Sequence, residues 1–196
     1  MNKIKAQPLL NYIENFISLT DEEVDILLQN ISFRNYLKGQ YIAQQGDVCK
    51  SSYFVVKGCT KMFYLDDIGQ EHIIMFSIEN WWTGDLGSYI AQLPSDYHVQ
   101  CLEPTQVITF SYEDREVLFE KIPKLERFFR LIIERALVST NKRLVRNFSL
   151  TAKARYIYFK EQYPEIEKRI PQYMIASYLG ITKEFLSKIK RQLLND

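Results

Sequence analysis

The sequence predicts an α+β fold made of an N-terminal antiparallel β-roll of jelly-roll type, one long helix and a small helical C-terminal domain. Three observations lead to this prediction. Short β-rich runs alternate with turn residues between positions 32 and 112. Apolar residues then recur at helical spacing, and the tail from 170 to 194 reads as two short helices joined by a tight turn. We therefore expect three parts, with boundaries at 1–123, 124–146 and 147–196.

Two amphipathic helices are expected before the β-rich region. Residues 8–18 carry apolar side chains at steps of three and four. Thr20 and Glu23 then form the pattern of a capping box, in which each side chain bonds the backbone N–H of the other residue. A second helix should start there, and both helices read as packing elements without chemistry of their own.

The β-rich region reads as a set of short antiparallel strands. The candidate strands are 41–47, 52–67, 71–77, 98–103 and 105–111. Glycine, aspartate and proline separate them, most clearly at Gly46, Gly58, Gly69 and Pro94. Several short strands at this spacing predict a β-barrel or β-sandwich.

The helical stretch that follows is more apolar than a helix packed on one side needs. Pro123 should separate a short helix from the long one, because proline suits a helix start and breaks a helix interior. In one interpretation the long helix covers the β-roll and also pairs in parallel with a second copy, through Phe129, Ile132, Ile133 and Ala136. In the other it is the centre of one thick monomer core. Ser149 is expected to cap the next helix.

The tail has the pattern of a helix-turn-helix. Pro171 suits a first helical turn, Gly180 a C-cap and Thr182 an N-cap. Ala176, four residues before the glycine, is small enough for the second helix to cross closely. The apolar stripe expected in that second helix is Phe185, Leu186, Ile189 and Leu193. Helix-turn-helix units place the second helix in the DNA major groove; the alternative is an ordinary helical hairpin with a solvated basic face.

The charge distribution favours a polyanion as partner of the C-terminal part only. The net charge of +1 hides 12 Lys and Arg against 5 Asp and Glu from Lys142 onward, a balance of +7, with −6 for the preceding residues. The side chains predicted to contact double-stranded DNA are Gln172, Thr182, Lys183, Glu184, Ser187, Lys188, Lys190 and Arg191.

Composition argues against several other classes of protein. The three cysteines form no CxxC pair, so neither a zinc site nor a cysteine-held iron–sulfur cluster is indicated, and buried thiols in a reducing cytoplasm are expected. No run resembles a signal peptide or a membrane span. A cupin-type metalloenzyme would need clustered His and Glu ligands, whereas His72 and His98 stand alone. We expect no catalytic residues, no metal and no enzyme activity.

The order of the elements, together with local sequence, resembles the Crp/Fnr family of bacterial regulators. Gln45, Gly46 and Asp47, followed by Lys57 and Gly58, match the turns of that family's β-roll. The resemblance implies a homodimer on a palindromic DNA operator, an effector sensed by the β-roll, and RNA polymerase as a further partner. The rival interpretation of the same resemblance is a β-roll module that acts on a protein partner rather than on DNA.

The resemblance also implies where bases and phosphates meet the second tail helix. Lys183, Glu184 and Lys188 occupy the positions that read bases in the family, whereas Lys190 and Arg191 are expected at phosphates. Family members commonly continue into a β-hairpin wing, which the two residues after Leu194 do not supply. Further phosphate contacts are therefore expected from Lys153, Arg155, Lys168 and Arg169.

The expected effector site departs from the cyclic-nucleotide-binding members of the family. Those members carry Gly-Glu-Leu, followed ten residues after the Glu by an Arg that neutralises the phosphate. Here the first motif is Gly84, Asp85 and Leu86, and the Arg position falls on Ser95, next to Asp96. Losing the charge-assisted pair removes roughly 1.5–3 kcal/mol of binding, so cyclic AMP and cyclic GMP are expected to bind poorly. A plain turn at the first motif is the alternative.

Two residues of the long helix complete the expected effector site. By the resemblance, Thr140 and Asn141 lie where the dimer helix meets the base of a bound nucleotide. No cofactor is expected, and the identity of the effector stays open.

Overall fold

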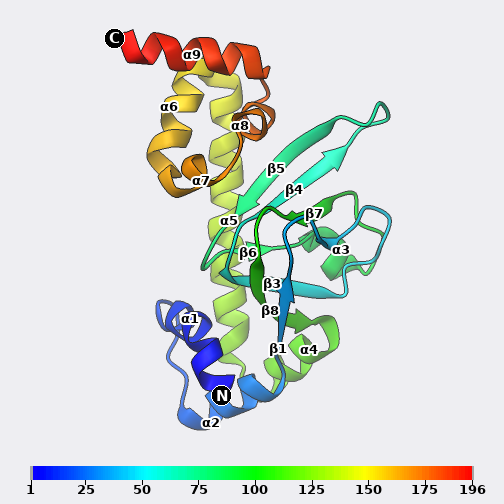
Figure 1. Cartoon of the computed structure of the whole chain (residues 1–196). Helices are drawn as coiled ribbons and strands as arrows, with labels where there is room; N and C mark the ends of the chain where they lie inside the picture. Colours follow the sequence, from blue (N-terminus) through cyan, green and yellow to red (C-terminus); the bar gives the residue numbers. More distant parts are fainter. Residues whose placement is uncertain (1, 196) are drawn as a thin grey trace.

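The computed structural model describes residues 2–195 as an α+β fold built around one long helix. Figure 1 shows the β-roll and the small helical C-terminal part stacked along that helix, α5. The helices are α1 (Asn2–Glu14), α2 (Asp21–Gln29), α3 (Leu86–Ala91), α4 (Tyr112–Lys121), α5 (Lys124–Ser149), α6 (Ala152–Gln162), α7 (Pro164–Arg169), α8 (Gln172–Leu179) and α9 (Lys183–Asn195). The strands are β1 (Ser32–Tyr36), β2 (Tyr41–Ala43), β3 (Ser51–Lys57), β4 (Thr60–Leu65), β5 (Glu71–Ser77), β6 (Trp82–Thr83), β7 (His98–Cys101) and β8 (Thr105–Ser111). The predicted fold class is confirmed.

The β-roll consists of two antiparallel sheets with strand orders β1-β8-β3-β6 and β2-β7-β4-β5. The run 52–67, read as one strand from the sequence, is two strands that separate at Gly58. This glycine has a φ of +115°, and a Cβ built there would lie 2.5 Å from the Thr105 hydroxyl. Only a glycine fits such a close backbone approach.

The helices before the sheets pack where the sequence predicted, but the first of them begins earlier. Helix α1 starts at Asn2 rather than at residue 8, with Pro8 inside it. The earlier turn is kept because Ala6, on the inner face, is fully buried. The capping box at the start of α2 is confirmed: the Glu23 N–H donates to the Thr20 hydroxyl over 3.2 Å, and the Thr20 N–H donates to the Glu23 carboxylate over 2.7 Å.

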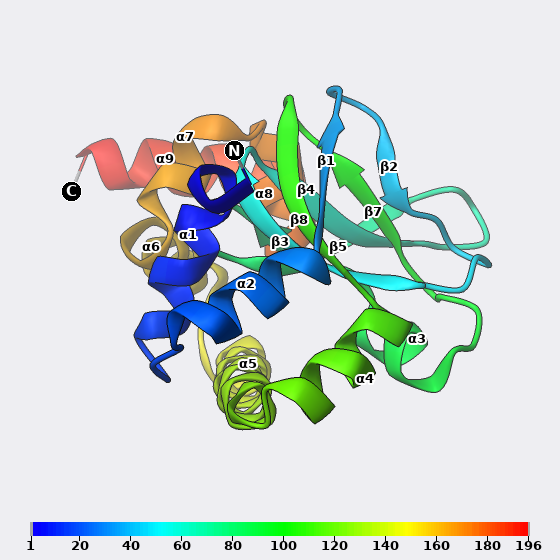
Figure 2. The same ribbon diagram turned by 90° about the horizontal axis from the view of Figure 1, so that it is seen from below.

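The first hydrophobic core lies between one sheet, the N-terminal helices and the first half of α5. Its centre is aromatic: Phe128 packs edge-on against Phe16 with ring centres 5.4 Å apart, and Phe129 packs likewise against Trp82 at 5.4 Å. Figure 2, viewed along α5, shows α1, α2 and α4 arranged around this end of the helix. Burial of the core anchors α5 to the β-roll.

Helix α5 is longer than predicted and has two distinct apolar faces. It ends at Ser149, so that residue does not cap the next helix; Thr151 does, accepting from the Ala154 N–H over 3.2 Å. The break falls there because Leu150 has an extended backbone, with φ −108° and ψ 146°. Phe129 and Ile132, predicted for a dimer seam, instead pack against the β-roll core.

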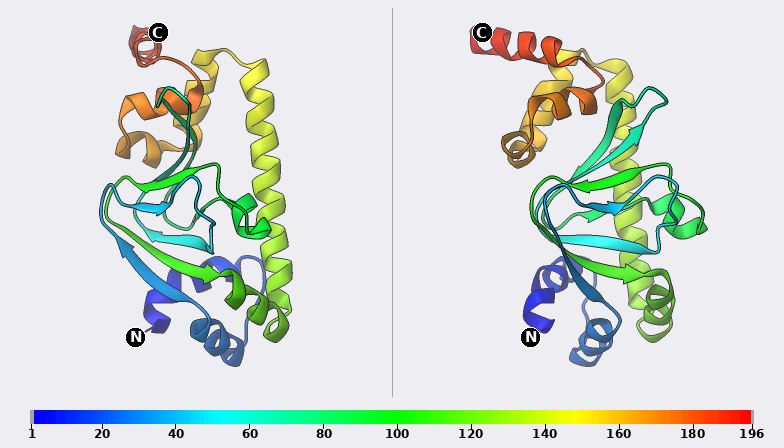
Figure 3. Two further views of the ribbon diagram at one scale, coloured as in Figure 1. Left: turned by 90° about the vertical axis from the view of Figure 1, so that its right-hand side faces the viewer. Right: turned by 45° about the vertical axis from the view of Figure 1, so that its right-hand side comes forward.

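A second apolar stripe on α5 is exposed. At steps of four, three, four and four residues it carries Ile133, Leu137, Thr140, Leu144 and Phe148. Leu137 is 60% exposed and Phe148 is 83% exposed. Figure 3 shows one flank of α5 running along the outside of the molecule without a covering element. We call these five residues the α5 stripe. None of the helices within residues 2–195 combines the length and apolar composition needed to cross a membrane.

Candidate nucleic-acid interface and effector site

The turn between α8 and α9 has the local structure that its sequence predicts. Gly180 adopts a left-handed backbone, with φ 65° and ψ 38°. The Ile181 N–H donates back to the Ala176 carbonyl over 3.0 Å, which is the bond that closes a helix end of this kind. Thr182 caps α9 by accepting from the Phe185 N–H over 3.1 Å. These bonds fix the angle at which α9 leaves α8.

Helix α9 has one buried face and one charged face. Leu186 and Ile189 are buried in the core that α9 shares with α6 and α8. Phe185, predicted for the same stripe, is 46% exposed, because it lies one position before Leu186 and turns toward the outer face. The outer face is polar: Lys183, Glu184, Lys188 and Arg191 are exposed, and Ser187 is half-buried. Gln172 is also exposed, at the start of α8.

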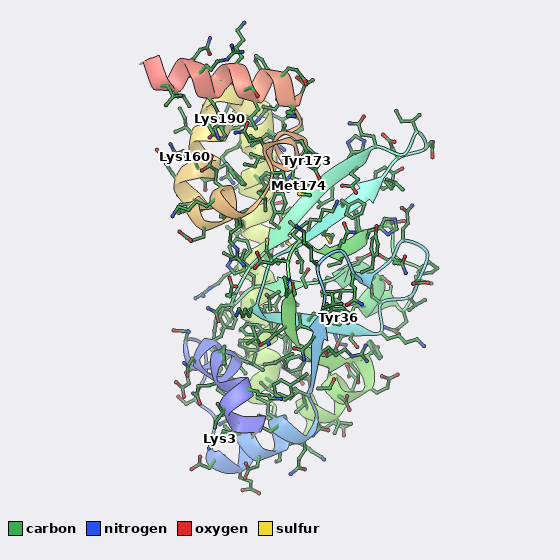
Figure 4. The ribbon with its side chains drawn as sticks, viewed as in Figure 1. Lys3, Tyr36, Lys160, Tyr173, Met174 and Lys190 are labelled. Atoms are coloured by element: carbon green, nitrogen blue, oxygen red, sulfur yellow. The ribbon has the colours of Figure 1, made fainter. Side chains whose placement is uncertain are left out.

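Lys190, expected to meet DNA phosphates, is half-buried and forms an ion pair within the chain. Its ammonium group lies 3.2 Å from the Glu167 carboxylate and 5.8 Å from the centre of the Tyr156 ring. Figure 4 shows Lys190 beneath α9, on the side that faces α6. Glu167 also accepts from the Tyr156 hydroxyl over 2.9 Å, so the three side chains form one network under the helix.

Two of the predicted auxiliary phosphate contacts are also engaged internally. The Arg155 guanidinium donates to the carbonyls of Asn147 at 3.1 Å and Leu179 at 3.1 Å, which ties the ends of α5 and α8 together. Arg169 is bound to two carboxylates of the β-roll. Lys168 remains on the surface, paired with Glu165.

The helix-turn-helix unit is docked on the β-roll through the strand β5. The Ser177 hydroxyl on α8 donates to the Glu71 carbonyl over 2.8 Å and accepts from the Ile73 N–H over 3.0 Å. It therefore replaces a neighbouring strand at these two backbone groups. The Tyr178 ring packs against Phe76 with centres 5.6 Å apart. The buried core of the helical unit is continuous with that of this sheet.

Two arginines add charged contacts across the same junction. Arg169 forks between Glu79, at 2.7 Å, and Glu103, and Glu79 also accepts from the Gly58 N–H over 2.8 Å. Burial alone would raise the pKa of Glu79, but the hydrogen bonds from Arg169 and Gly58 lower it overall. Arg143 of α5 donates to the Ile74 carbonyl and, over 3.2 Å, to the Tyr178 carbonyl. Neither arginine was predicted from the sequence to make these contacts; the available signal for Arg143 was a basic residue on the inner side of an apolar helix.

The effector region brings Asp85 and Ser95 into direct contact. Asp85 caps the short helix α3: one carboxylate oxygen accepts from the Ser88 N–H over 3.1 Å. The other accepts from the Ser95 hydroxyl over 2.9 Å. Both residues are buried. Gly84 has a φ of +124°, which turns the chain sharply into this helix.

This arrangement does not fit a cyclic phosphate. The oxygens of Asp85 and the Ser95 hydroxyl are already used by partners within the chain, since Ser95 also bonds the Tyr97 backbone. The neighbouring Asp96 and Leu86 are exposed and bring no positive charge. A phosphate placed here would face a buried carboxylate without a counter-ion, which is unfavourable.

Thr140 and Asn141 lie on α5, both exposed, with Thr140 in the α5 stripe. Within one chain they are therefore on a different element from Asp85 and Ser95. Among residues 2–195, no group of three or more His, Cys, Asp or Glu side chains could hold a metal ion. The three cysteines are free thiols and buried. Burial raises the pKa of Cys59 to about 12, so this thiol stays protonated.

Comparison with known proteins finds similarity in both the β-roll and the helical C-terminal part. The family model for the cyclic nucleotide-binding domain matches residues 33–121, which hold the β-roll. The transcriptional activator protein Anr of Pseudomonas aeruginosa is 25% identical over 185 residues, covering 88% of this chain and 75% of the relative. The fumarate and nitrate reduction regulatory protein of Vibrio cholerae is 26% identical over 187 residues, covering 88% and 73%.

Solved structures share the fold. The c-di-GMP-responsive regulator CLP of Xanthomonas campestris superposes with a TM-score of 0.72 at 17% identity, covering 90% of this chain and 93% of that one. FixK2 of Bradyrhizobium japonicum gives 0.71 at 18% identity, covering 84% and 85%. The catabolite activator protein of Thermus thermophilus gives 0.55 at 21% identity, covering 91% and 85%. The similarity thus extends through the β-roll, the long helix and the helix-turn-helix.

Proposed function

We propose, from the premise that this chain belongs to the Crp/Fnr family of DNA-binding transcriptional regulators, that it acts as a homodimer on a two-fold-symmetric operator. The observation that carries the proposal is the outer face of α9. Four charged side chains, Lys183, Glu184, Lys188 and Arg191, stay exposed there while the opposite face is buried. A helix with this division can enter the major groove without losing its packing.

The α5 stripe supplies the surface for the homodimer. Its steps of three and four residues are those of a coiled-coil seam, and its apolar side chains are exposed in the single chain. Parallel pairing across a two-fold axis would bury it and place two α9 helices on one face of the dimer. Half-sites in helix-turn-helix operators lie about 34 Å apart, one turn of DNA.

The exposed residues of α9 divide into two roles. Lys183, Glu184 and Lys188 lie in its first half, the part that reaches base edges in helix-turn-helix proteins. Lys bonds guanine O6 and N7, and Glu accepts from cytosine N4. Arg191, one turn further along, is assigned to the phosphates. Thr182, Ser187 and Gln172 are assigned to contacts that position the helix on the DNA. Lys190 is left out of the interface because Glu167 already holds it.

The docked helix-turn-helix unit gives the β-roll a route to control DNA binding. A ligand can shift an equilibrium only through different affinities for the two states. An effector of the β-roll that alters β5 or Glu79 would change the contacts made by Ser177 and Arg169. Cyclic AMP is not proposed as that effector, because the Ser95 hydroxyl already donates a hydrogen bond to the Asp85 carboxylate.

A DNA-selection experiment tests this function directly. The purified protein is incubated with a pool of random duplexes, with and without a fraction of small metabolites from cells. We expect enrichment of one palindrome, with binding that falls steeply as salt rises. If no sequence is enriched under either condition, the rival function, a β-roll module acting on a protein partner, is favoured instead.

A further inference from the structure

A small cavity lies where α5, α6 and α8 meet, apart from both α9 and the Asp85 region. Its volume is about 30 Å³, room for about two water molecules. Its walls carry three arginines and three tyrosines: Arg143, Arg146, Arg155, Tyr158, Tyr163 and Tyr178. The DNA-binding function gives none of the three arginines a role.

The positive charge at this cavity has no carboxylate on its walls. None of the described residues that line it is Asp or Glu. Arg143 and Arg155 give their hydrogen bonds to backbone carbonyls, which carry no net charge. The groups that bear on Tyr178 are Arg143 and Arg146 together with Tyr163 and Tyr158, again without an acid. Three positive charges therefore share one site, and none of the described residues on its walls carries a negative charge.

Two of these arginines stack on tyrosine rings, and the third has a buried N–H donor without a partner in the described part of the chain. The guanidinium of Arg146 lies 4.0 Å from the centre of the Tyr158 ring, and that of Arg143 lies 3.9 Å from the Tyr178 ring. The Nε of Arg155 is buried and has no hydrogen-bond partner among the residues that the structure describes. A buried N–H without an acceptor is unfavourable, by about 1–3 kcal/mol.

We propose that this cavity, the α5–α6–α8 site, binds the phosphate group of a small phosphorylated molecule. The guanidiniums supply charge-assisted hydrogen bonds, for which phosphate is a preferred acceptor. The cavity has room for the phosphate group alone, so the rest of the molecule would lie outside it. Because the site joins the end of α5 to the helix-turn-helix, occupancy would stiffen that junction. The binding itself does not depend on the proposed DNA function.

Calorimetric titration with inorganic phosphate, AMP and ADP tests the proposal, at low ionic strength and in a buffer without multivalent anions. We expect saturable binding of one ligand per chain, with AMP and ADP as well as with inorganic phosphate. Trp81 lies 5.7 Å from Tyr163, ring centre to ring centre, so its fluorescence should change on binding. If phosphate alone binds, the site is one for the free ion; if neither the ion nor a nucleotide binds at millimolar concentration, the proposal is wrong.

The control uses two variants of equal charge on one helix. Arg146→Gln removes a guanidinium that stacks on a wall of the cavity. Arg127→Gln removes one that is exposed on α5, nineteen residues and about 28 Å away. We expect Arg146→Gln to weaken ADP binding at least about tenfold, the loss of one charge-assisted contact, and Arg127→Gln to leave it unchanged.

Equal loss in both variants would show that binding follows overall charge, and would overturn the proposal. Circular dichroism of both variants separates this outcome from misfolding, and Arg146→Lys gives a second variant that keeps the charge. DNA binding is measured separately: a protein that binds ADP but no DNA leaves this site standing and removes the proposed function.

Discussion

At the scale of single residues, the contacts of a basic side chain decide what it can do. Lys188 and Lys190 are two positions apart on α9, yet Lys188 is exposed and Lys190 is paired with Glu167 under the helix. The sequence alone did not show that their surroundings differ, because both lysines fit a basic helix face. The caps at Gly180 and Thr182 were predictable, since they depend only on neighbours within a few residues.

The first prediction compares three basic side chains of α9. Lys188→Ala should lose discrimination at one base pair per half-site, by roughly 1–3 kcal/mol. Arg191→Ala should weaken all sequences alike and lower the salt slope by about one unit. Binding is measured against single-base operator variants at several salt concentrations. A uniform loss across all operators for Lys188→Ala would show that this residue contacts phosphate instead.

Lys190→Ala is the matched control for that series. Removal of a half-buried ion pair should lower the free energy of unfolding by up to about 1 kcal/mol and leave the salt slope of DNA binding unchanged. A slope that falls by about one unit would place Lys190 at a phosphate after all.

At the scale of elements, α5 shows which part of a pattern the sequence can resolve. Its excess of apolar positions was visible, but the division between faces was not. Phe129 and Ile132 pack against the β-roll core. The partners of Phe129, Trp82 and Phe110, come from strands remote in sequence, so no local pattern marks this face. Ile133, one position on, is exposed. The short helices α3 and α7 were not predicted, since six residues carry little periodicity.

The second prediction concerns the α5 stripe. Leu144→Asp would place a carboxylate in an apolar seam, and should raise the dimer dissociation constant at least about 100-fold. Val138→Asp is the control: it is exposed on the same helix, 52% like Leu144, but lies off the stripe. Sedimentation velocity over a concentration series measures both. A parent protein that is monomeric at micromolar concentration would falsify the seam itself.

At the scale of the whole molecule, the decisive contacts join residues 66 to 106 positions apart. Ser177 reaches Glu71, and Arg169 reaches Glu79 and Glu103. No local pattern marks such partners, so the sequence predicted the two parts but not their docking. Asp85 and Ser95 could be predicted as site residues only from the family resemblance. The hydrogen bond that joins them is visible only in the structure.

The third prediction concerns this docking. Arg169→Ala removes both ion pairs and should lower the free energy of unfolding by about 1–2 kcal/mol. The helix-turn-helix unit should also become more mobile, because it loses its charged tie to the β-roll. Hydrogen exchange at α8 and β5 is the measurement, with Lys168→Ala as a neighbouring surface control. Unchanged exchange at both elements would mean that the apolar contacts suffice.

The fourth prediction is a dependence on pH. The pKa of Glu79 is lowered in the folded protein, although burial opposes this, because Arg169 and the Gly58 N–H bond its charged form. Its contribution to stability is therefore present above the ordinary value of 4.5 and is lost as pH falls through the lower, folded pKa. Denaturant unfolding at pH 6 and pH 3.5 should show a smaller loss for Glu79→Gln than for the parent. Equal losses would assign the acid sensitivity to other carboxylates.

The role of Ser177 on β5 has a consequence for solubility. β5 is the last strand of its sheet, and an uncovered strand edge is a template for aggregation. The Ser177 hydroxyl blocks that template at Glu71 and Ile73 while the two parts are docked. Any state in which the helix-turn-helix swings away leaves these groups open to a strand from another molecule. The released form should therefore be the one that aggregates in a crowded cell, and bound DNA or a quick return to docking would limit its lifetime.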